Sequence, residues 1–159
     1  MSGGWLSIIF IFCSFKLVIF SFFYFTILFV SIVSMFGSIF GMLLYFITLT
    51  LGRETQVALS VVFLLTGIQI CEKAAKKLGQ HDHPSIVWDE MAVMFGILLF
   101  VPATIMSWAS IFLFFRLFDI WKPWPINSFD KRVGGGLGIM GDDVLAGFIA
   151  LLFQKILFL

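Results

Sequence analysis

The stretch that decides the fold is MAVMFGILLFVPATIMSWASIFLFF, Met91–Phe115, an apolar run that contains no charged residue and one proline. A helix that spans a bilayer needs about 20 predominantly apolar residues, and Pro102 lacks the N–H that a helix interior uses. We therefore predict one helix on each side of Pro102. With their polar flanks these helices have roughly 16 to 18 residues, or about 24 to 27 Å. Together they form a tight helical hairpin.

The rest of the chain is similarly apolar. Hydrophobic residues make up 61% of its 159 residues and charged residues only 12%, against roughly 25% charged in ordinary soluble domains. No segment alternates with the period of a barrel strand. We expect an all-α, polytopic helical membrane protein, with an apolar N-terminal membrane segment at 1–34 and a helical domain at 35–159. Its other apolar helices are expected at Trp5–Val33, Phe36–Leu51, Thr55–Leu78 and Val144–Leu159.

Basic residues indicate which side of the membrane the polar segments face. They cluster at 73–77 and at 116–132, and the positive-inside rule places both clusters in the cytoplasm. The hairpin between them must then cross an even number of times. It would bring IVWDE and RLFDIWKPWPI together at the cytoplasmic membrane face.

Charge and cysteine content exclude other classes. The net charge of +1 gives no electrostatic basis for binding nucleic acid. Cys13 and Cys71 are too few and too far apart for a disulfide framework or a zinc site. We interpret them as small buried hydrophobic residues.

Four of the nine acids form two adjacent pairs, Asp89–Glu90 and Asp142–Asp143, each directly before an expected apolar helix. Acids there can cap a helix or complement its dipole. One cap does not require two acids, however, and ionisable groups beside a bilayer are costly. Carboxylate oxygens are also the ligands that hard divalent ions prefer. We favour a metal site over helix capping.

Arg116, Asp119 and Lys122 follow the hairpin at i, i+3 and i+6. On a continued helix they could form an ion-pair ladder. They could equally form a phosphate clamp, because Arg binds phosphate oxygens in a bidentate manner and Lys supplies a point charge. The sequence favours neither. Prolines at 123 and 125 should end the helix.

The glycine-rich stretch VGGGLGIMGDD contains a G-x-G-x-x-G pattern. No strand is expected before it and no acid follows some 20 residues later, so a dinucleotide site is not indicated. Gly135, Gly136 and Gly138 could instead offer backbone amides that cradle a phosphate. A flexible linker is the alternative. His81 and His83 are more consistent with an exposed polar loop than with metal ligation.

Three segments, HDHPSIVWDE, FRLFDIWKPWPINSFD and GGGLGIMGDDVLAG, resemble the phosphatidylglycerophosphatase A family of bacterial membrane lipid phosphatases. The resemblance covers about residues 35–150. It implies hydrolysis of the phosphomonoester of phosphatidylglycerophosphate to phosphatidylglycerol, with Mg2+, at the bacterial inner membrane during phospholipid synthesis. The positions that match the family's motif acids and bases are Asp89, Glu90, Asp119, Asp130, Asp142, Asp143, Arg116 and Lys122.

The expected roles follow from the chemistry of phosphoryl transfer. Five acids would bind the metal: Asp89, Glu90, Asp130, Asp142 and Asp143. A metal of this kind polarises phosphoryl oxygens and lowers the pKa of a bound water. Arg116 and Lys122 would neutralise the phosphoryl oxygens, and we include Asp119 in the catalytic set.

Two alternatives remain. A small divalent-cation transporter would carry acids deep within its spanning segments, whereas here they are expected at segment ends. A catalytically weakened relative that acts as a membrane partner is the second alternative. It is suggested by VSMFGS, which has Ser34 and Met35 where the family's P-G-T-x-G-S turn has Gly and Thr.

Overall fold

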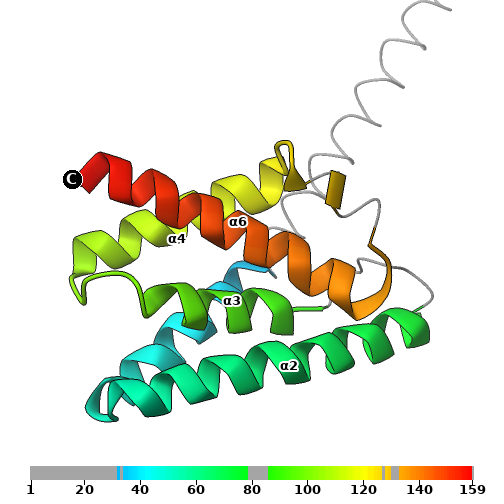
Figure 1. Cartoon of the computed structure of the whole chain (residues 1–159), viewed down its shortest axis with the longest axis horizontal. Helices are drawn as coiled ribbons and strands as arrows, with labels where there is room; N and C mark the ends of the chain where they lie inside the picture. Colours follow the sequence, from blue (N-terminus) through cyan, green and yellow to red (C-terminus); the bar gives the residue numbers. More distant parts are fainter. Residues whose placement is uncertain (1–31, 33, 79–85, 127, 130–132, 159) are drawn as a thin grey trace, which may run out of the picture. The chain divides into compact units, whose positions relative to one another are not determined.

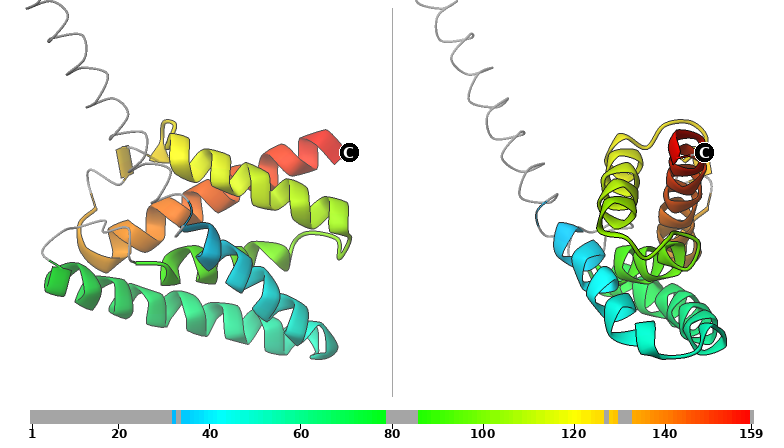
Figure 2. Two further views of the ribbon diagram at one scale, coloured as in Figure 1. Left: turned by 180° about the vertical axis from the view of Figure 1, so that it is seen from behind. Right: turned by 90° about the vertical axis from the view of Figure 1, so that its left-hand side faces the viewer.

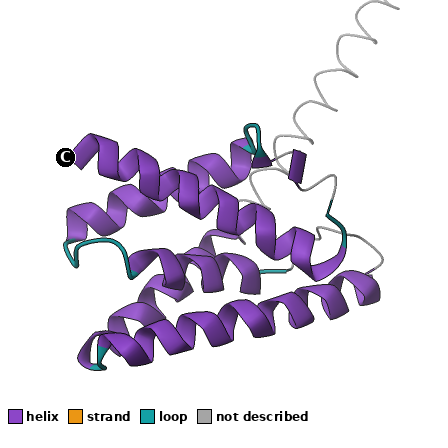
Figure 3. Ribbon diagram, in the orientation of Figure 1, coloured by secondary structure: helices purple, strands orange, loops and turns teal. Residues whose placement is uncertain are grey.

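The computed structural model describes residues 32, 34–78, 86–126, 128–129 and 133–158. The chain divides into two compact units, 1–32 and 33–159, and the elements below belong to the second. A helix at 34–47 continues into a short 3-10 turn, and four longer helices follow. Their bounds are η1 (Thr48–Thr50), α2 (Arg53–Leu78), α3 (Trp88–Leu98), α4 (Ile105–Trp121) and α6 (Gly135–Phe158). The described part of the chain contains no strand (Figure 3), so the all-α prediction is confirmed.

Helix α3 lies at the centre of the bundle, with the helix at 34–47, α2, α4 and α6 around it (Figure 2). Nine of its eleven residues are buried. Phe95 and Leu98 are fully enclosed, together with Ile111 and Phe115 of α4. The core of this unit is therefore built around the helix whose first turn carries the first pair of acids.

The hairpin around Pro102 is present, but its first helix is shorter than predicted. Helix α4 has 17 residues, as expected, whereas α3 has 11. At 1.5 Å per residue α3 is about 16 Å long, too short to cross a hydrocarbon core of about 30 Å. It ends early because proline restricts the preceding residue to extended backbone, and the chain turns at Leu99–Val101 to meet it. Thr104 then caps α4 by accepting a hydrogen bond from Ser107 N at 3.2 Å.

Helix α6 begins at Gly135, nine residues before the predicted start at Val144. Gly136 explains the difference. A Cβ there would lie 1.9 Å from the carbonyl oxygen of Ile68 and 2.9 Å from the amide nitrogen of Glu72, both in α2. Close packing of α6 on α2 thus outweighs the low helix propensity of glycine.

The bundle has two distinct ends. At one, which we call the acidic end, α3 and α6 begin and α2 and α4 finish (right in Figure 1). At the other end, Arg53 Nη2 donates to Leu99 O at 3.0 Å, and Lys155 lies in the last turn of α6. Within the described residues, two helices are long and apolar enough to cross a membrane, Arg53–Lys77 and Gly135–Phe158, and 34–50 forms a shorter apolar helix.

Candidate active site

The two acid pairs have the same local geometry and lie on different helices at the acidic end. In each pair the first acid accepts a hydrogen bond from the amide of the second: Asp89 Oδ1 from Glu90 N, and Asp142 Oδ1 from Asp143 N, both at 3.0 Å. All four side chains are buried. The main chain therefore helps to fix the first carboxylate of each pair.

Helix capping explains only one of these pairs. Asp89 and Glu90 lie in the first turn of α3, where they complement the helix dipole. Asp142 and Asp143 lie about two turns into α6, whose first turn contains no acid. The capping interpretation is therefore wrong for Asp142–Asp143, because the helix starts at Gly135. The expectation that the acids stand at segment ends, which counted against a transporter, is also wrong for this pair.

Arg116 joins two of the motifs. Its Nη1 lies 2.8 Å from Asp119 Oδ2 on the same helix and 3.3 Å from Glu90 Oε2 on α3. The guanidinium is buried in this contact. The prediction that the hairpin brings IVWDE and RLFDIWKPWPI together is thus confirmed by an ion pair.

Lys122 does not continue the ladder along α4. Its Nζ lies 2.6 Å from Asp142 Oδ2 on α6. Helix α4 ends just before it, at Trp121, as the following proline predicts, and Lys122 takes left-handed backbone with φ 41°. The ladder interpretation therefore holds for the Arg116–Asp119 pair, and the lysine links two helices across the acidic end.

One serine that sequence reasoning did not assign to the site contacts it, and a second is buried one turn further along the same helix. The Ser34 hydroxyl donates a hydrogen bond to Glu90 Oε1. Ser38, one turn later, is fully buried and its Oγ has no hydrogen-bond partner. Gly37 lets this helix approach, since a Cβ there would lie 2.8 Å from Val87 O. The Gly-Ser pair that this chain shares with the family's turn was the available signal.

Glu90 illustrates the electrostatic cost of the cluster. It lies outside the two candidate spans, and burial raises its pKa to about 8. The Arg116 guanidinium and the Ser34 hydroxyl oppose this rise, while Asp119 and Asp89 add to it. Asp143 in turn interacts with Asp119, Asp89, Asp142 and Glu90. The carboxylates are thus close enough to disfavour one another's charge, and a further cation would stabilise them.

The carboxylate oxygens at the acidic end are chemically suitable ligands for a hard divalent ion. Glu90 Oε2 and Asp143 Oδ2 are buried and accept no hydrogen bond. Oxygen donors of this type, completed by water and substrate oxygens, are what Mg2+ prefers. Among the described residues, no three acid, histidine or cysteine side chains already converge as a metal cage. Asp130, His81 and His83 fall outside the described residues, so those predictions are not addressed.

The glycine-rich stretch forms the first turns of α6. Gly135 has φ 73°, which favours glycine, and Gly136 and Gly138 are buried. The contact of Gly136 with α2 accounts for that glycine by packing, without an anion. The flexible-linker alternative is wrong for these three residues, because they belong to a helix. A phosphate cradle at Gly135, Gly136 and Gly138 stays a prediction.

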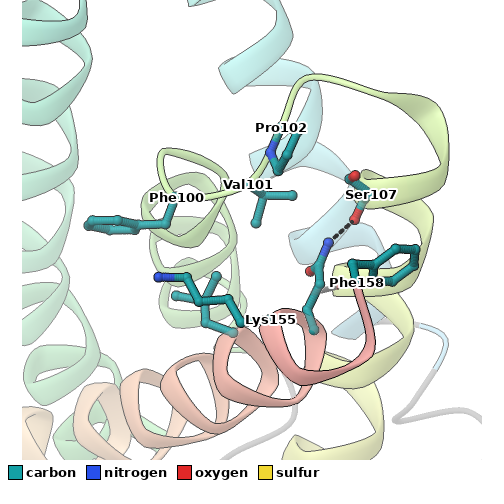
Figure 4. Close-up of a pocket in the computed structure, with 8 residues that line it drawn as sticks. Phe100, Val101, Pro102, Ser107, Lys155 and Phe158 are labelled. Carbon is teal, nitrogen blue, oxygen red and sulfur yellow. Dashed lines mark hydrogen bonds between the residues drawn. The ribbon is translucent and has the colours of Figure 1, made fainter.

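A pocket of about 280 Å³ lies at the opposite end of the bundle (Figure 4). Phe100, Pro102 and Lys155 are among its lining residues, and Gln154 Nε2 donates to Ser107 O there at 3.0 Å. None of the described residues that line it is an acid. The described lining of this pocket therefore offers no carboxylate for metal binding or acid-base chemistry.

Comparison with known proteins agrees with the motifs. The family model "Phosphatidylglycerophosphatase A" matches residues 6–158. Phosphatidylglycerophosphatase A of Escherichia coli K12 is 49% identical over 85 residues, which is 53% of this chain and 49% of that protein. The Haemophilus influenzae protein of the same name is 41% identical over 118 residues, or 73% and 72% of the two chains.

A third relative, from Bacteroides thetaiotaomicron, is provisionally named a phosphatidylinositol-3-phosphatase. It is 38% identical over 115 residues, 70% of this chain and 71% of that protein. The match to the E. coli protein spans about half of that relative's length. No solved structure matches the chain. The family model covers nearly the whole chain, so the resemblance is confirmed, and the chain belongs to the phosphatidylglycerophosphatase A family.

Proposed function

We propose that this protein hydrolyses the phosphomonoester of phosphatidylglycerophosphate, releasing phosphatidylglycerol and inorganic phosphate. The observation that carries the proposal is the acidic end itself. There a buried arginine and a lysine are held by carboxylates from three helices, in a chain of this family. Such a cluster suits a phosphate dianion, because positioning and charge stabilisation are most of what phosphoryl transfer requires.

The proposal includes a position in the membrane. The acidic end carries Lys73, Lys76 and Lys77 beside Arg116 and Lys122, whereas the opposite ends of the described helices carry Arg53 and Lys155. The positive-inside rule then places the acidic end at the cytoplasmic face of a bacterial inner membrane, in a multi-pass protein. Gly134 is exposed near this end. A cysteine introduced by Gly134→Cys should therefore react with a membrane-impermeant thiol reagent in inverted vesicles. Labelling in spheroplasts instead would reverse the assignment.

Arg116 and Lys122 are proposed to bind the phosphoryl oxygens. Asp119 orients the guanidinium at 2.8 Å, and Asp142 holds the ammonium at 2.6 Å. Both cations are thus positioned before substrate arrives. In the reaction a water oxygen bonds to phosphorus and the bond from phosphorus to the glycerol oxygen breaks. That oxygen leaves with a proton, giving the alcohol of phosphatidylglycerol.

We further propose that Asp89, Glu90, Asp142 and Asp143 hold Mg2+, with Asp130 as a further candidate. When bound, the ion would polarise the phosphoryl group and lower the pKa of a water. The support is chemical: two of these carboxylates have buried oxygens without a hydrogen bond. Ser38 Oγ, which is also buried and unpartnered, is available for a phosphate oxygen or a bound water.

The serine at position 34 favours an intact enzyme over a weakened relative. Although Ser34 departs from the family's turn, its hydroxyl hydrogen-bonds to Glu90. The position therefore contributes to the acidic end. Met35, in contrast, supplies no hydroxyl.

The test is phosphate release from phosphatidylglycerophosphate in detergent micelles, with Mg2+ and with EDTA. Wild type should release phosphate only with Mg2+, and Asp142→Asn should release little under either condition. The matched control is Glu54→Gln, an exposed carboxylate at the opposite end, which should behave as wild type. A well-folded wild type that prefers phosphatidylinositol 3-phosphate would overturn the substrate assignment, and an Asp142→Asn variant with normal turnover would overturn the site.

A further inference from the structure

An apolar groove of about 450 Å³ runs along the surface between the helix at 34–47 and α4. The two helices that form it are the blue-to-cyan and the yellow-green ribbons of Figure 2. Its walls are apolar apart from the indole N–H of Trp108, which is buried without a hydrogen-bond partner. Several of the side chains are well exposed, so the groove is open to its surroundings. The lining residues are Met35, Ile39, Met42, Leu43, Phe46, Trp108, Ala109 and Phe112.

The groove starts next to the candidate active site. Met35 directly follows Ser34, whose hydroxyl contacts Glu90, and Phe112 lies one helical turn before Arg116. A molecule in the groove could therefore reach the acidic end without leaving the protein surface. The groove is thus adjacent in sequence, on both of its helices, to residues of the acidic end.

Its length fits one leaflet of a bilayer. From Met35 to Phe46 is eleven helical steps, or about 16 Å at 1.5 Å per residue. Half of a hydrocarbon core of about 30 Å is about 15 Å. Phe46 and Trp108 meet edge to face at 6.3 Å at the far end. With the acidic end at the proposed membrane face, a groove of this length along the membrane normal would reach about the depth at which one leaflet ends.

We propose that this groove holds one acyl chain of the lipid substrate while the phosphate lies at the acidic end. The identity of the lipid rests on the proposed function. Lipid tails are as apolar as the groove, so the groove gains no hydrophobic driving force from taking up a chain. Its effect comes from shape, because a seated acyl chain restricts where the headgroup can reach. The phosphate of the substrate is thereby held beside Arg116 and Lys122.

Photo-crosslinking tests the occupant without requiring activity. Purified full-length protein in nanodiscs would be irradiated with phosphatidylglycerol that carries a diazirine in one acyl chain, and the adducts mapped by mass spectrometry. Adducts should concentrate on Ile39, Leu43 and Ala109, relative to Val61 and Leu65 on the exposed face of α2. Equal labelling of both faces would overturn the proposal. So would an unlabelled groove, as expected if residues 1–31 or a second copy of the chain fill it.

A matched pair of variants tests the consequence for catalysis. Ala109→Trp fills the groove, and Ala58→Trp places the same ring at an exposed alanine of α2. Because the added ring excludes the chain, we expect Ala109→Trp to raise KM for the diacyl substrate about tenfold. Hydrolysis of the deacylated headgroup should be unchanged, and Ala58→Trp should match wild type on both. A general loss on both substrates, or no change on either, would contradict the groove. If wild type hydrolyses neither the diacyl substrate nor the deacylated headgroup, the proposed function is contradicted. The crosslinking result then decides whether the groove holds an acyl chain.

Discussion

Replacing Arg116 by glutamine should destabilise the protein strongly. Arg116 Nη1 lies 2.8 Å from Asp119 and 3.3 Å from Glu90, and the three side chains are 8%, 13% and 9% exposed. Removing one partner of a buried ion pair leaves an uncompensated charge and costs about 3–5 kcal/mol. We expect Arg116→Gln to lose about this much free energy of unfolding. In a chain of this size the melting temperature would fall by roughly 6–20 °C.

Glu90→Gln should cost much less, about 1–2 kcal/mol. In this variant Arg116 retains its ion pair with Asp119, and the new amide oxygen can still accept the hydrogen bond that Ser34 donates. Combining the two changes removes one of the two carboxylates that Arg116→Gln leaves unpaired. The double variant should therefore be more stable than Arg116→Gln alone, by about 1 kcal/mol or more.

Cys71 provides the assay. It is fully buried, so a thiol-reactive fluorescent dye reports unfolding in a Cys13→Ser background. Melting would be followed in detergent with EDTA, so that no divalent ion compensates the acids. Arg53→Gln is the control, because this exposed arginine bonds a backbone oxygen at the opposite end. If the melting temperature of the double variant is equal to or lower than that of Arg116→Gln, the idea that Glu90 and Arg116 share one buried charge network is refuted.

Two further sites give contrasting pairs of variants in the same assay. Ser34→Ala should lose about 1–3 kcal/mol, since a buried oxygen of Glu90 is left without its hydrogen bond; Ser38→Ala, whose hydroxyl has no partner, should melt like wild type yet release phosphate more slowly. Gly136→Ala should cost about 3 kcal/mol or more, because its Cβ would lie 1.9 Å from an α2 carbonyl oxygen that cannot rotate away. Gly134→Ala meets nothing within 4 Å and should be neutral. Equal behaviour within either pair would contradict the packing described here.

The sequence predicted the features that depend on local chemistry. The break at Pro102 and the end of α4 before Pro123 follow from the missing N–H of proline, and both are observed. The contact between Glu90 and Arg116 was predictable as well, because a hairpin places its two outer ends together. Sequence reasoning therefore located the candidate site on three of its helices before any coordinates.

The features it missed depend on tertiary packing. Glycine has low helix propensity, so nothing local indicates that α6 begins at Gly135. The helix forms there because Gly136 lies against the α2 backbone. Ser34 and Glu90 are 56 residues apart in the chain, and no spacing rule connects them. Their contact depends on how the helix at 34–47 packs on α3, which apolar periodicity alone does not determine.

The balance of charge at the acidic end explains why phosphate binding should depend on a divalent ion. Asp89, Glu90, Asp119, Asp142 and Asp143 face only two cations among the described residues, Arg116 and Lys122. Counting the described side chains alone, five ionised acids would exceed these two cations by three charges. Burial, with smaller contributions from Asp119 and Asp89, raises the pKa of Glu90. A phosphate dianion would add to the excess and would compete with the carboxylates for both cations. One or two Mg2+ ions would offset the surplus and leave Arg116 and Lys122 available to the substrate. On this reasoning a bound ion would contribute to binding the substrate as well as to its hydrolysis.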